Sequence, residues 1–176
     1  MEIIENALIP ALDTVGKGFE SGKVFLPQLL TAASAASAAF DAVREVMQQS
    51  GVQQNKGTVV IATVQGDIHD IGKNIVKTLL ENYGYEVIDL GRDVPPETVA
   101  QTVATKDVRL CGLSALMTTT VPAMEQTVRL LREAAPACKV MVGGAVLTEQ
   151  YAAMIGADAY APDALGAVRY AEEVFG

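Results

Sequence analysis

Blocks of apolar residues alternate with polar ones along residues 58–176. The block Val59–Val64 is rich in β-branched residues and almost wholly apolar, which is typical of a strand buried on both faces. After a short polar loop, apolar residues return at helical spacing from Ile75 to Leu80. The same order repeats, and it predicts strands near residues 58–64, 85–90, 108–113, 138–142 and 157–160, and helices near residues 72–83, 96–105, 121–135, 147–154 and 163–175.

This rhythm of strand and helix predicts an α/β fold with a doubly wound parallel sheet. Short connections between the units imply right-handed crossovers, with helices on both faces of the sheet. Five strands favour the flavodoxin-like (Rossmann-like) order 2-1-3-4-5, whose switch point lies between the first and third strands. Ligands bind at the carboxyl ends of the strands beside such a point, so we expect the loops after the first and third strands to lie together.

Residues 1–50 have a helical pattern and are expected to form a separate cap of two helices. Apolar residues spaced three or four apart indicate the first helix: Ile4, Leu8, Leu12 and Val15. Pro10 should bend this helix or mark a break near its start, and three glycines are expected to interrupt it: Gly16, Gly18 and Gly22. The second helix is predicted from about Pro27 to Met47. Polar residues 51–57 indicate a linker before a domain of residues 58–176.

Charge and composition narrow the possible functions. The formal net charge is −8 and the pI about 4.6, so a nucleic-acid backbone would be repelled and no nucleic-acid partner is expected. No apolar run approaches the roughly 18 residues of a membrane span, and the acidic first residues do not resemble a secretion signal. Cys111 and Cys138 are isolated within apolar segments, which is typical of core residues in a reducing compartment. We therefore expect a cytoplasmic protein with no membrane partner.

The polar loop after the first predicted strand contains the one histidine of the chain, His69. Asp67 precedes it by two residues, so its carboxylate can accept the proton on one ring nitrogen and leave the other as an outward-pointing ligand. Gly66 and Gly72 flank the pair and would let the backbone approach a bulky group. A closed site for a free transition ion needs about four ligands. A lone histidine therefore suits a metal whose other positions a macrocycle fills; an inert surface histidine is the alternative.

At these residues the sequence resembles a known family. The run Asp67-x-His69-x-x-Gly72 is similar to the signature of the cobalamin-binding (corrinoid-binding) modules of methionine synthase and the corrinoid methyltransferase proteins. Three further segments resemble the same family in order, and the matches together cover nearly the whole chain. They are Phe25-Leu26-Pro27-Gln28-Leu29, from the helical cap of the methyltransferase branch, Ser114-Ala115-Leu116 with Thr118 and Thr120, and Gly143-Gly144-Ala145.

The resemblance implies cobalamin as the cofactor, bound with its own base off the metal. His69 would replace dimethylbenzimidazole as the axial cobalt ligand, and the displaced nucleotide tail would thread into the protein. Thr120 would hydrogen-bond Asp67, so that Thr120, Asp67 and His69 form a relay that tunes the imidazole as a donor. Independently, Thr119 or Thr120 is expected to cap the following helix. The resemblance places these further residues around the cofactor: Gly66, Ile68, Asp70, Gly72, Ser114, Leu116, Thr118, Gly143, Gly144 and Ala164.

Caps in this family are usually four-helix bundles, and residues 1–50 resemble only the later half. The resemblance places four residues of this half near the upper, methyl-bearing face of the corrin: Glu5, Phe19, Leu26 and Leu29. Ordinary packing between helices would explain the three apolar ones equally well. Two helices alone bury little of their apolar stripes, so a homodimer through these helices is a further expectation.

The resemblance favours a carrier that is no enzyme by itself. It would take a methyl group from a donor domain or subunit as cob(I)alamin and deliver it, as methylcobalamin, to an acceptor methyltransferase. Tetrahydrofolate with homocysteine, methanol, methylamines and aryl methyl ethers are all compatible, and the cap pattern leans towards a methionine-synthase-like origin. The alternatives are a cobalamin-dependent mutase subunit, a cobalamin-based sensor and a corrin-free receiver-like signalling domain. A receiver would need an acidic residue at Ser114 and a lysine near Tyr160, which disfavours the last.

Overall fold

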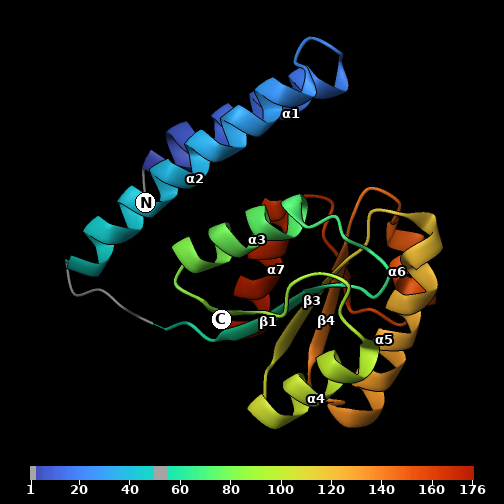
Figure 1. The fold of residues 1–176 in the computed structure, drawn as a ribbon. Helices are drawn as coiled ribbons and strands as arrows, with labels where there is room; N and C mark the ends of the chain where they lie inside the picture. The colour runs from blue at the N-terminus through green and yellow to red at the C-terminus, as the bar shows by residue number, and fades with distance from the viewer. Residues whose placement is uncertain (1–2, 50–54) are drawn as a thin grey trace. The chain divides into compact units, whose positions relative to one another are not determined.

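A helical unit comes first in the chain. The computed structural model describes residues 3–49 and 55–176, and these fall into two compact units, residues 1–53 and 54–176. In the first unit a π-helical turn, η1 (Ile4–Leu8), leads directly into helix α1 (Ile9–Glu20), and helix α2 (Leu26–Gln49) follows, as Figure 1 shows. The two helices that the sequence predicts for this unit are therefore present.

Proline and glycine act differently in these helices. Pro10 lies in the first turn of α1, directly after the π-helical turn, so it marks a break near the start as predicted. The interruption predicted at Gly16 and Gly18 is wrong, because both glycines lie inside α1. Glycine costs a helix interior only about 1 kcal/mol relative to alanine, which contacts between the helices can offset. Gly22 alone lies beyond the helix, with a φ of +72° that glycine adopts without strain.

The second unit alternates strand and helix as predicted. Its five strands are β1 (Thr58–Thr63), β2 (Glu86–Asp89), β3 (Leu110–Ser114), β4 (Lys139–Gly143) and β5 (Ala159–Tyr160). Its helices are α3 (Ile71–Asn82), α4 (Pro96–Lys106), α5 (Val121–Ala134), α6 (Glu149–Met154) and α7 (Ala164–Phe175), with a 3₁₀ turn, η2 (Thr118–Thr120), before α5. All strand pairs are parallel and the order is β2-β1-β3-β4-β5, which confirms the predicted flavodoxin-like sheet.

The two faces of the sheet are covered by different helices. Helices α4 and α5 pack together over one face, and α3 and α7 pack together over the other (Figure 1). Successive residues of a strand point to opposite faces. In β1, Val60 and Ala62 belong to the core beneath α4 and α5, so Ile61 and Thr63 face α3 and α7.

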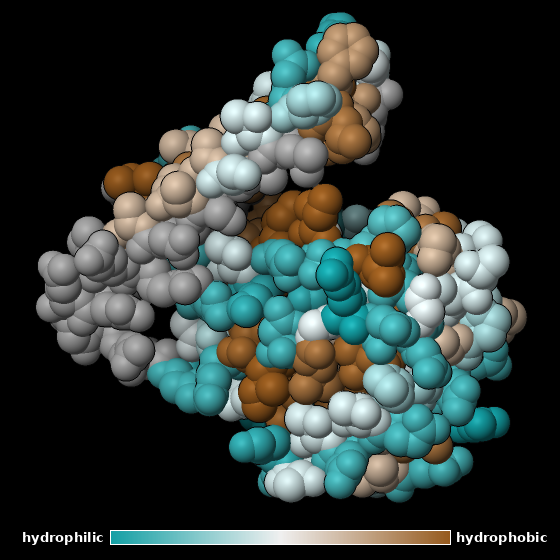
Figure 2. Space-filling view, viewed as in Figure 1, coloured by the Kyte–Doolittle hydropathy of each residue, from teal (hydrophilic) through white to brown (hydrophobic). Residues whose placement is uncertain are grey.

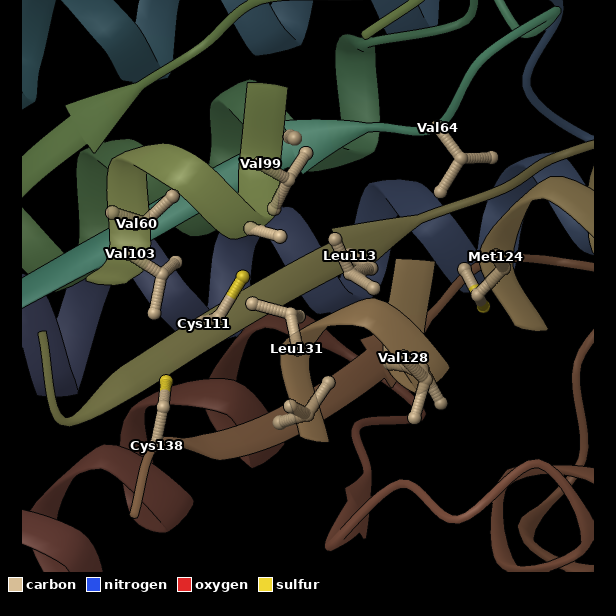
Figure 3. Close-up of a cluster of buried hydrophobic side chains, with 14 of the residues drawn as sticks. Val60, Val64, Val99, Val103, Cys111, Leu113, Met124, Val128, Leu131 and Cys138 are labelled. Carbon is tan, nitrogen blue, oxygen red and sulfur yellow. The ribbon is translucent and has the colours of Figure 1, made fainter. Parts of the chain in front are cut away.

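The core under α4 and α5 is apolar throughout. Figure 3 shows valines and leucines from β1, β3, α4 and α5 meeting there, together with Met124. Cys111 and Cys138 are buried in this cluster, which confirms their prediction as core residues. Burial raises the pKa of the Cys111 thiol, and it raises that of Cys138 to about 12, so both remain protonated at neutral pH.

The surface mixes polar and apolar residues. Figure 2 shows apolar side chains at the surface of both units among hydrophilic ones. Ile3, Phe25 and Leu26 are exposed on the helical unit, and Ile68 and Leu116 are exposed on the sheet unit. Within residues 3–49 and 55–176, no helix combines the length and the apolar character needed to cross a bilayer.

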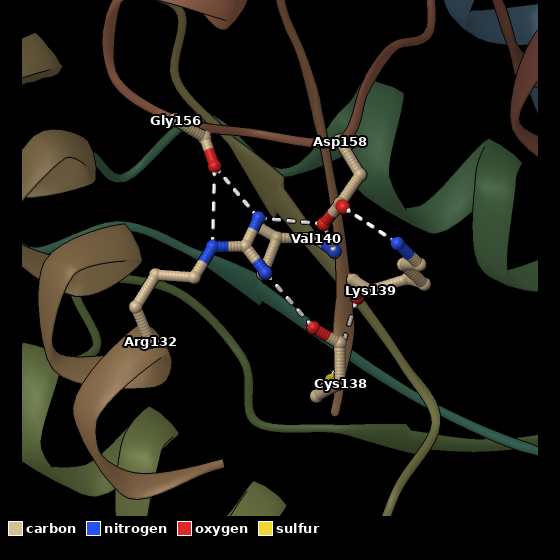
Figure 4. Close-up of polar contacts among 6 residues, drawn as sticks. All are labelled: Arg132, Cys138, Lys139, Val140, Gly156 and Asp158. Atoms are coloured by element: carbon tan, nitrogen blue, oxygen red, sulfur yellow. Dashed lines mark hydrogen bonds and ion pairs between the residues drawn. The ribbon is translucent and has the colours of Figure 1, made fainter. Parts of the chain in front are cut away.

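An ionic cluster joins α5 to the edge of the sheet at β4 and β5. Asp158 accepts hydrogen bonds from Arg132 Nη2 at 2.6 Å, from the Val140 backbone N–H at 2.8 Å and from Lys139 Nζ at 3.0 Å (Figure 4). Arg132 also donates to the Gly156 carbonyl. Burial alone would raise the pKa of Asp158, but the hydrogen bonds from Arg132, Val140 and Lys139 outweigh it and hold this pKa below its ordinary value.

We predict that Asp158→Asn lowers the free energy of unfolding by about 2 kcal/mol near neutral pH, because hydrogen bonds to a charged acceptor are lost. A carboxylate with a lowered pKa stabilises the fold above its unfolded pKa of about 4 and stops doing so as the pH falls through its folded value. The difference between wild type and variant should therefore shrink below about pH 4 in urea unfolding experiments. Asp107→Asn, at an exposed aspartate, is the control and should change little. A difference independent of pH would contradict this account.

Two fully buried threonines differ in their hydrogen bonding. Thr127 Oγ1 donates to the Ala123 carbonyl at 2.7 Å. Thr63, at the carboxyl end of β1, is equally buried, yet its Oγ1 has no partner among the described residues. A buried hydroxyl without a partner costs about 1–3 kcal/mol.

We predict that Thr63→Val raises the free energy of unfolding of the cofactor-free protein by about 1 kcal/mol, because the isosteric change removes an unpaired hydroxyl. Thr127→Val should lower it by about 1 kcal/mol, since a hydrogen bond is lost there. Urea unfolding of the two variants measures both changes. Equal destabilisation by both substitutions would show that the Thr63 hydroxyl is paired in solution.

Candidate functional site

Two loops meet at the carboxyl edge of the sheet, as the predicted strand order requires. Residues 64–70 lead from β1 to α3, and residues 115–117 follow β3. The Val64 N–H donates to the Ser114 carbonyl at 3.1 Å, which extends the pairing of β1 with β3 beyond the strands. The loop that contains His69 therefore lies beside the loop that contains Leu116, which Thr118 follows at the start of η2.

Asp67 is the centre of this junction, and its carboxylate is fully buried. Oδ1 accepts hydrogen bonds from the His69 backbone N–H at 2.9 Å and from His69 Nδ1 at 2.8 Å. Oδ2 accepts from the Leu116 backbone N–H at 2.7 Å and from Thr120 Oγ1 at 3.0 Å. Burial alone would raise the pKa of Asp67, but these four donors outweigh it and hold the pKa far below its ordinary value. Asp67 is therefore ionised at neutral pH.

The ionisation of Asp67 determines which ring nitrogen of His69 carries the proton. An ionised carboxylate only accepts hydrogen bonds, so the proton of the ring lies on Nδ1. In the neutral ring this leaves the lone pair of Nε2 free, and the side chain of His69 is 46% exposed. A neutral imidazole with one nitrogen held by a carboxylate is a good metal ligand. The donor set therefore fits one axial position on a metal.

The surroundings of His69 fit an apolar macrocycle. Ile68 and Ile71 are 61% and 54% exposed, and Leu116, in the adjoining loop, is 41% exposed. Exposed apolar side chains that gather in one place often mark a surface at which a ligand or partner binds. Among the described residues there is no group of three or more His, Cys, Asp or Glu side chains that could hold a bare metal ion.

The side chain of Thr120 binds Asp67 and does not cap helix α5. Thr120 is the residue preceding α5, yet its side chain makes no capping hydrogen bond, so the prediction that Thr119 or Thr120 caps this helix is wrong. Its hydroxyl donates to Asp67 Oδ2 and also lies 2.8 Å from the Met117 carbonyl. The hydrogen bond predicted between Thr120 and Asp67 is present, and a bond from a hydroxyl to an ionised carboxylate is stronger than one between neutral groups.

Thr63, Ser114 and Gly143 form a row across the end of the sheet. They are paired in the registers of β1, β3 and β4, and by strand alternation they face α3 and α7. Gly143 and Gly144 are predicted to leave a gap for a nucleotide tail. The structure gives Gly144 another reason, since a Cβ there would lie 1.8 Å from the Ala115 carbonyl oxygen, and its φ is +135°. The close approach of two backbones requires glycine at 144.

The other predicted site residues of the sheet unit surround this edge. Gly66 has a φ of +84°, as the turn after β1 requires, and a Cβ at Gly72 would meet nothing within 4 Å. Asp70 directly precedes α3 without capping it. Thr118, which begins η2, is exposed, and Ala164, which begins α7, is half-buried. No hydrogen bond joins these residues to His69, and their roles towards a cofactor stay predictions.

The predicted residues of the helical unit lie in α1, α2 and η1. Phe19 is 42% exposed and Leu26 is 54% exposed, and Leu29 is half-buried. The side chain of Glu5 lies outside the described residues. Their placement above a corrin stays a prediction.

One residue that sequence reasoning missed is Asp93. It lies just before α4, which begins at Pro96 as the helix predicted near residues 96–105 does. Asp93 Oδ1 accepts a hydrogen bond from the Gly66 N–H at 2.7 Å, and the Asp93 N–H donates to the Asp67 carbonyl at 2.9 Å. Only the pairing of β2 with β1 brings these segments together, so the local sequence around Asp93 contains no signal of it.

Comparisons with known proteins agree with this geometry. A model of the B12 binding domain family matches residues 57–169, and a second model with the same description matches residues 1–44. A dimethylamine corrinoid protein of Methanosarcina acetivorans is 43% identical over 175 residues, which is 98% of this chain and 82% of that protein.

Two solved structures are similar as well. The monomethylamine corrinoid protein of Methanosarcina barkeri has a TM-score of 0.68 at 34% identity, covering 98% of this chain and 82% of that one. A chain of a methanol:cobalamin methyltransferase complex of the same species has a TM-score of 0.69 at 32% identity, covering 99% of this chain and 67% of that one.

The corrin-free receiver-like alternative is therefore wrong, and the predicted cofactor, cobalamin, is confirmed. The chain belongs to the family of B12-binding corrinoid proteins.

Proposed function

We propose that this chain is the methyl-carrying corrinoid subunit of a methylamine methyltransferase system. The observation that carries the proposal is the hydrogen-bonded series Thr120, Asp67, His69, which ends in a free ring nitrogen at the sheet edge. When bound, a corrinoid supplies a cobalt centre that accepts a methyl group from one partner and gives it up to another. The relatives named for dimethylamine and monomethylamine support methylamines over a methionine-synthase-like origin.

In this proposal His69 is the axial cobalt ligand through Nε2. Asp67 holds the proton of the ring at Nδ1 and thereby sets both the tautomer and the orientation of the imidazole. Thr120 and the Leu116 N–H hold Asp67 in turn, so the carboxylate cannot rotate away from the ring. Residues of this kind usually change metal affinity by about 10- to 100-fold when removed.

The remaining residues would receive the body and the tail of the cofactor. Gly66, Ile68, Asp70, Gly72 and Leu116 surround His69 in the two loops and would lie under the corrin. The nucleotide tail, displaced from cobalt, would enter on the face covered by α3 and α7. The residues proposed for the tail are Ser114, Thr118, Gly143, Gly144 and Ala164. The half-buried pair Ser114 and Gly143, side by side at the ends of β3 and β4, supports them.

The helical unit would shield the opposite face of the corrin with Glu5, Phe19, Leu26 and Leu29. Donor and acceptor methyltransferase domains or subunits would bind here in turn; the similarity to a chain of a methanol:cobalamin methyltransferase complex supports such partners. The exposed apolar residues Ile3, Phe25 and Leu26 support pairing of two copies through these helices. Light scattering would show a single-copy mass if that pairing is absent.

We predict that the wild-type protein mixed with hydroxocobalamin elutes from gel filtration with one bound cobalamin. His69→Ala should weaken binding by at least about tenfold and shift the visible absorption of the bound cofactor, because the axial nitrogen is lost. Added imidazole should restore the wild-type spectrum of this variant, which separates loss of the ligand from loss of the fold. An unchanged spectrum and methyl-transfer rate in His69→Ala would end the proposal.

A further inference from the structure

The segment after β2 runs alongside the end of β1. The Thr63 N–H donates to the Gly91 carbonyl at 2.9 Å, and the Val94 N–H donates to the Thr63 carbonyl at 3.1 Å. Val64 and Val94 form an isolated parallel bridge one residue further. The β2 side of the sheet thus continues past the strands and reaches the start of the loop that contains His69.

Asp93 extends this contact into the loop itself. Its carboxylate Oδ1 accepts from the Gly66 N–H at 2.7 Å, and its own N–H donates to the Asp67 carbonyl at 2.9 Å. To make both hydrogen bonds the residue adopts a φ of +55°, a left-handed conformation that costs most side chains about 1 kcal/mol or more and that aspartate tolerates better than most. The conformation is therefore maintained by these two hydrogen bonds.

The two hydrogen bonds hold the backbone on both sides of Asp67. One fixes the peptide N–H of Gly66 and the other fixes the carbonyl of Asp67. The Asp67 carboxylate is then placed to reach both His69 Nδ1 and the Leu116 N–H. A metal ligand held 1 Å away from its productive position loses much of its effect.

We infer that Asp93 is a positioning residue for the cobalt-ligating histidine, acting through the backbone of Gly66 and Asp67. The inference rests on the proposed ligation by His69. No hydrogen bond joins Asp93 to the His69 side chain; Asp93 belongs to the connection between β2 and α4, on the opposite side of β1 from the Leu116 loop. The histidine loop is thus held from both neighbouring strands.

The chain offers a matched control in Asp107. It is the other non-glycine residue with positive φ, at +50°, among the described residues, and it ends α4. Its carboxylate makes no hydrogen bond within the described part of the chain. Asp107→Ala therefore changes the same residue type in the same backbone conformation without touching the histidine loop.

The test measures binding of diaquacobinamide, a corrinoid without the nucleotide tail, so that ligation at cobalt is not masked by tail contacts. Asp93→Ala should weaken binding roughly tenfold, the effect expected for loss of a hydrogen bond to a charged acceptor. In a His69→Ala background the same change should have no effect, since there is no ligand left to position. Asp93→Asn keeps an acceptor oxygen at the same place and should bind within about threefold of wild type.

Each other outcome has a distinct meaning. Equal weakening by Asp93→Ala in both backgrounds, or equal weakening by Asp107→Ala, would overturn the positioning role. The positioning role is also overturned if wild type binds diaquacobinamide more tightly than His69→Ala does, while Asp93→Ala binds it as tightly as wild type. Equal binding by wild type and His69→Ala would instead overturn the proposed ligation. If Asp93→Ala does not fold, Asp93→Gly removes the carboxylate without straining the positive φ and gives the same comparison.

Discussion

The buried carboxylate of Asp67 is the group on which the arrangement at the sheet edge depends. It accepts hydrogen bonds from its own loop through His69 and from the neighbouring loop through Leu116 and Thr120. A buried charge needs such donors, because burial without them would neutralise it. The requirement ties the loops after β1 and β3 together, and it leaves the histidine with one nitrogen bound and the other free.

This carboxylate can be satisfied only in a sheet that places β3 beside β1. The order β2-β1-β3-β4-β5 brings the Leu116 and Thr120 donors to one side of the loop and Asp93 to the other. The strand order of the sheet therefore determines which groups can hydrogen-bond to Asp67 and its backbone. The same carboxyl edge also carries the strained and unpaired groups, among them Asp93, Gly144 and the Thr63 hydroxyl. Such groups concentrate where a ligand binds.

The sheet unit is stabilised by an apolar core and an ion pair that both lie away from the His69 loop. The cluster under α4 and α5 consists of apolar side chains, and the Arg132–Asp158 pair ties α5 to the strands β4 and β5. Neither contains a residue that the family resemblance places around cobalamin. A change at Asp158 should therefore lower the stability of the fold without removing a hydrogen bond of the site.

Much of the fold was predictable, because long apolar blocks separated by polar loops specify a buried parallel sheet. The neighbouring positions of the His69 and Ser114 loops followed from strand order alone. The predictions that failed concern single residues, whose conformation or contacts depend on the folded structure and not on the neighbouring sequence. Gly16 and Gly18 remain helical inside α1, and Thr120 donates to a carboxylate 53 positions earlier instead of capping its own helix. Asp93 could not be recognised for the same reason.

The central claim is that His69, rather than the cofactor's own base, binds cobalt. Since the chain has a single histidine, protein grown with ¹⁵N-histidine carries the label in one imidazole only. Electron paramagnetic resonance of the cob(II)alamin-loaded protein reports the axial nitrogen through the splitting of each cobalt line. The account predicts three-line splitting in unlabelled protein and two-line splitting in labelled protein. Three-line splitting in both would show that dimethylbenzimidazole still occupies the axial position and would contradict it.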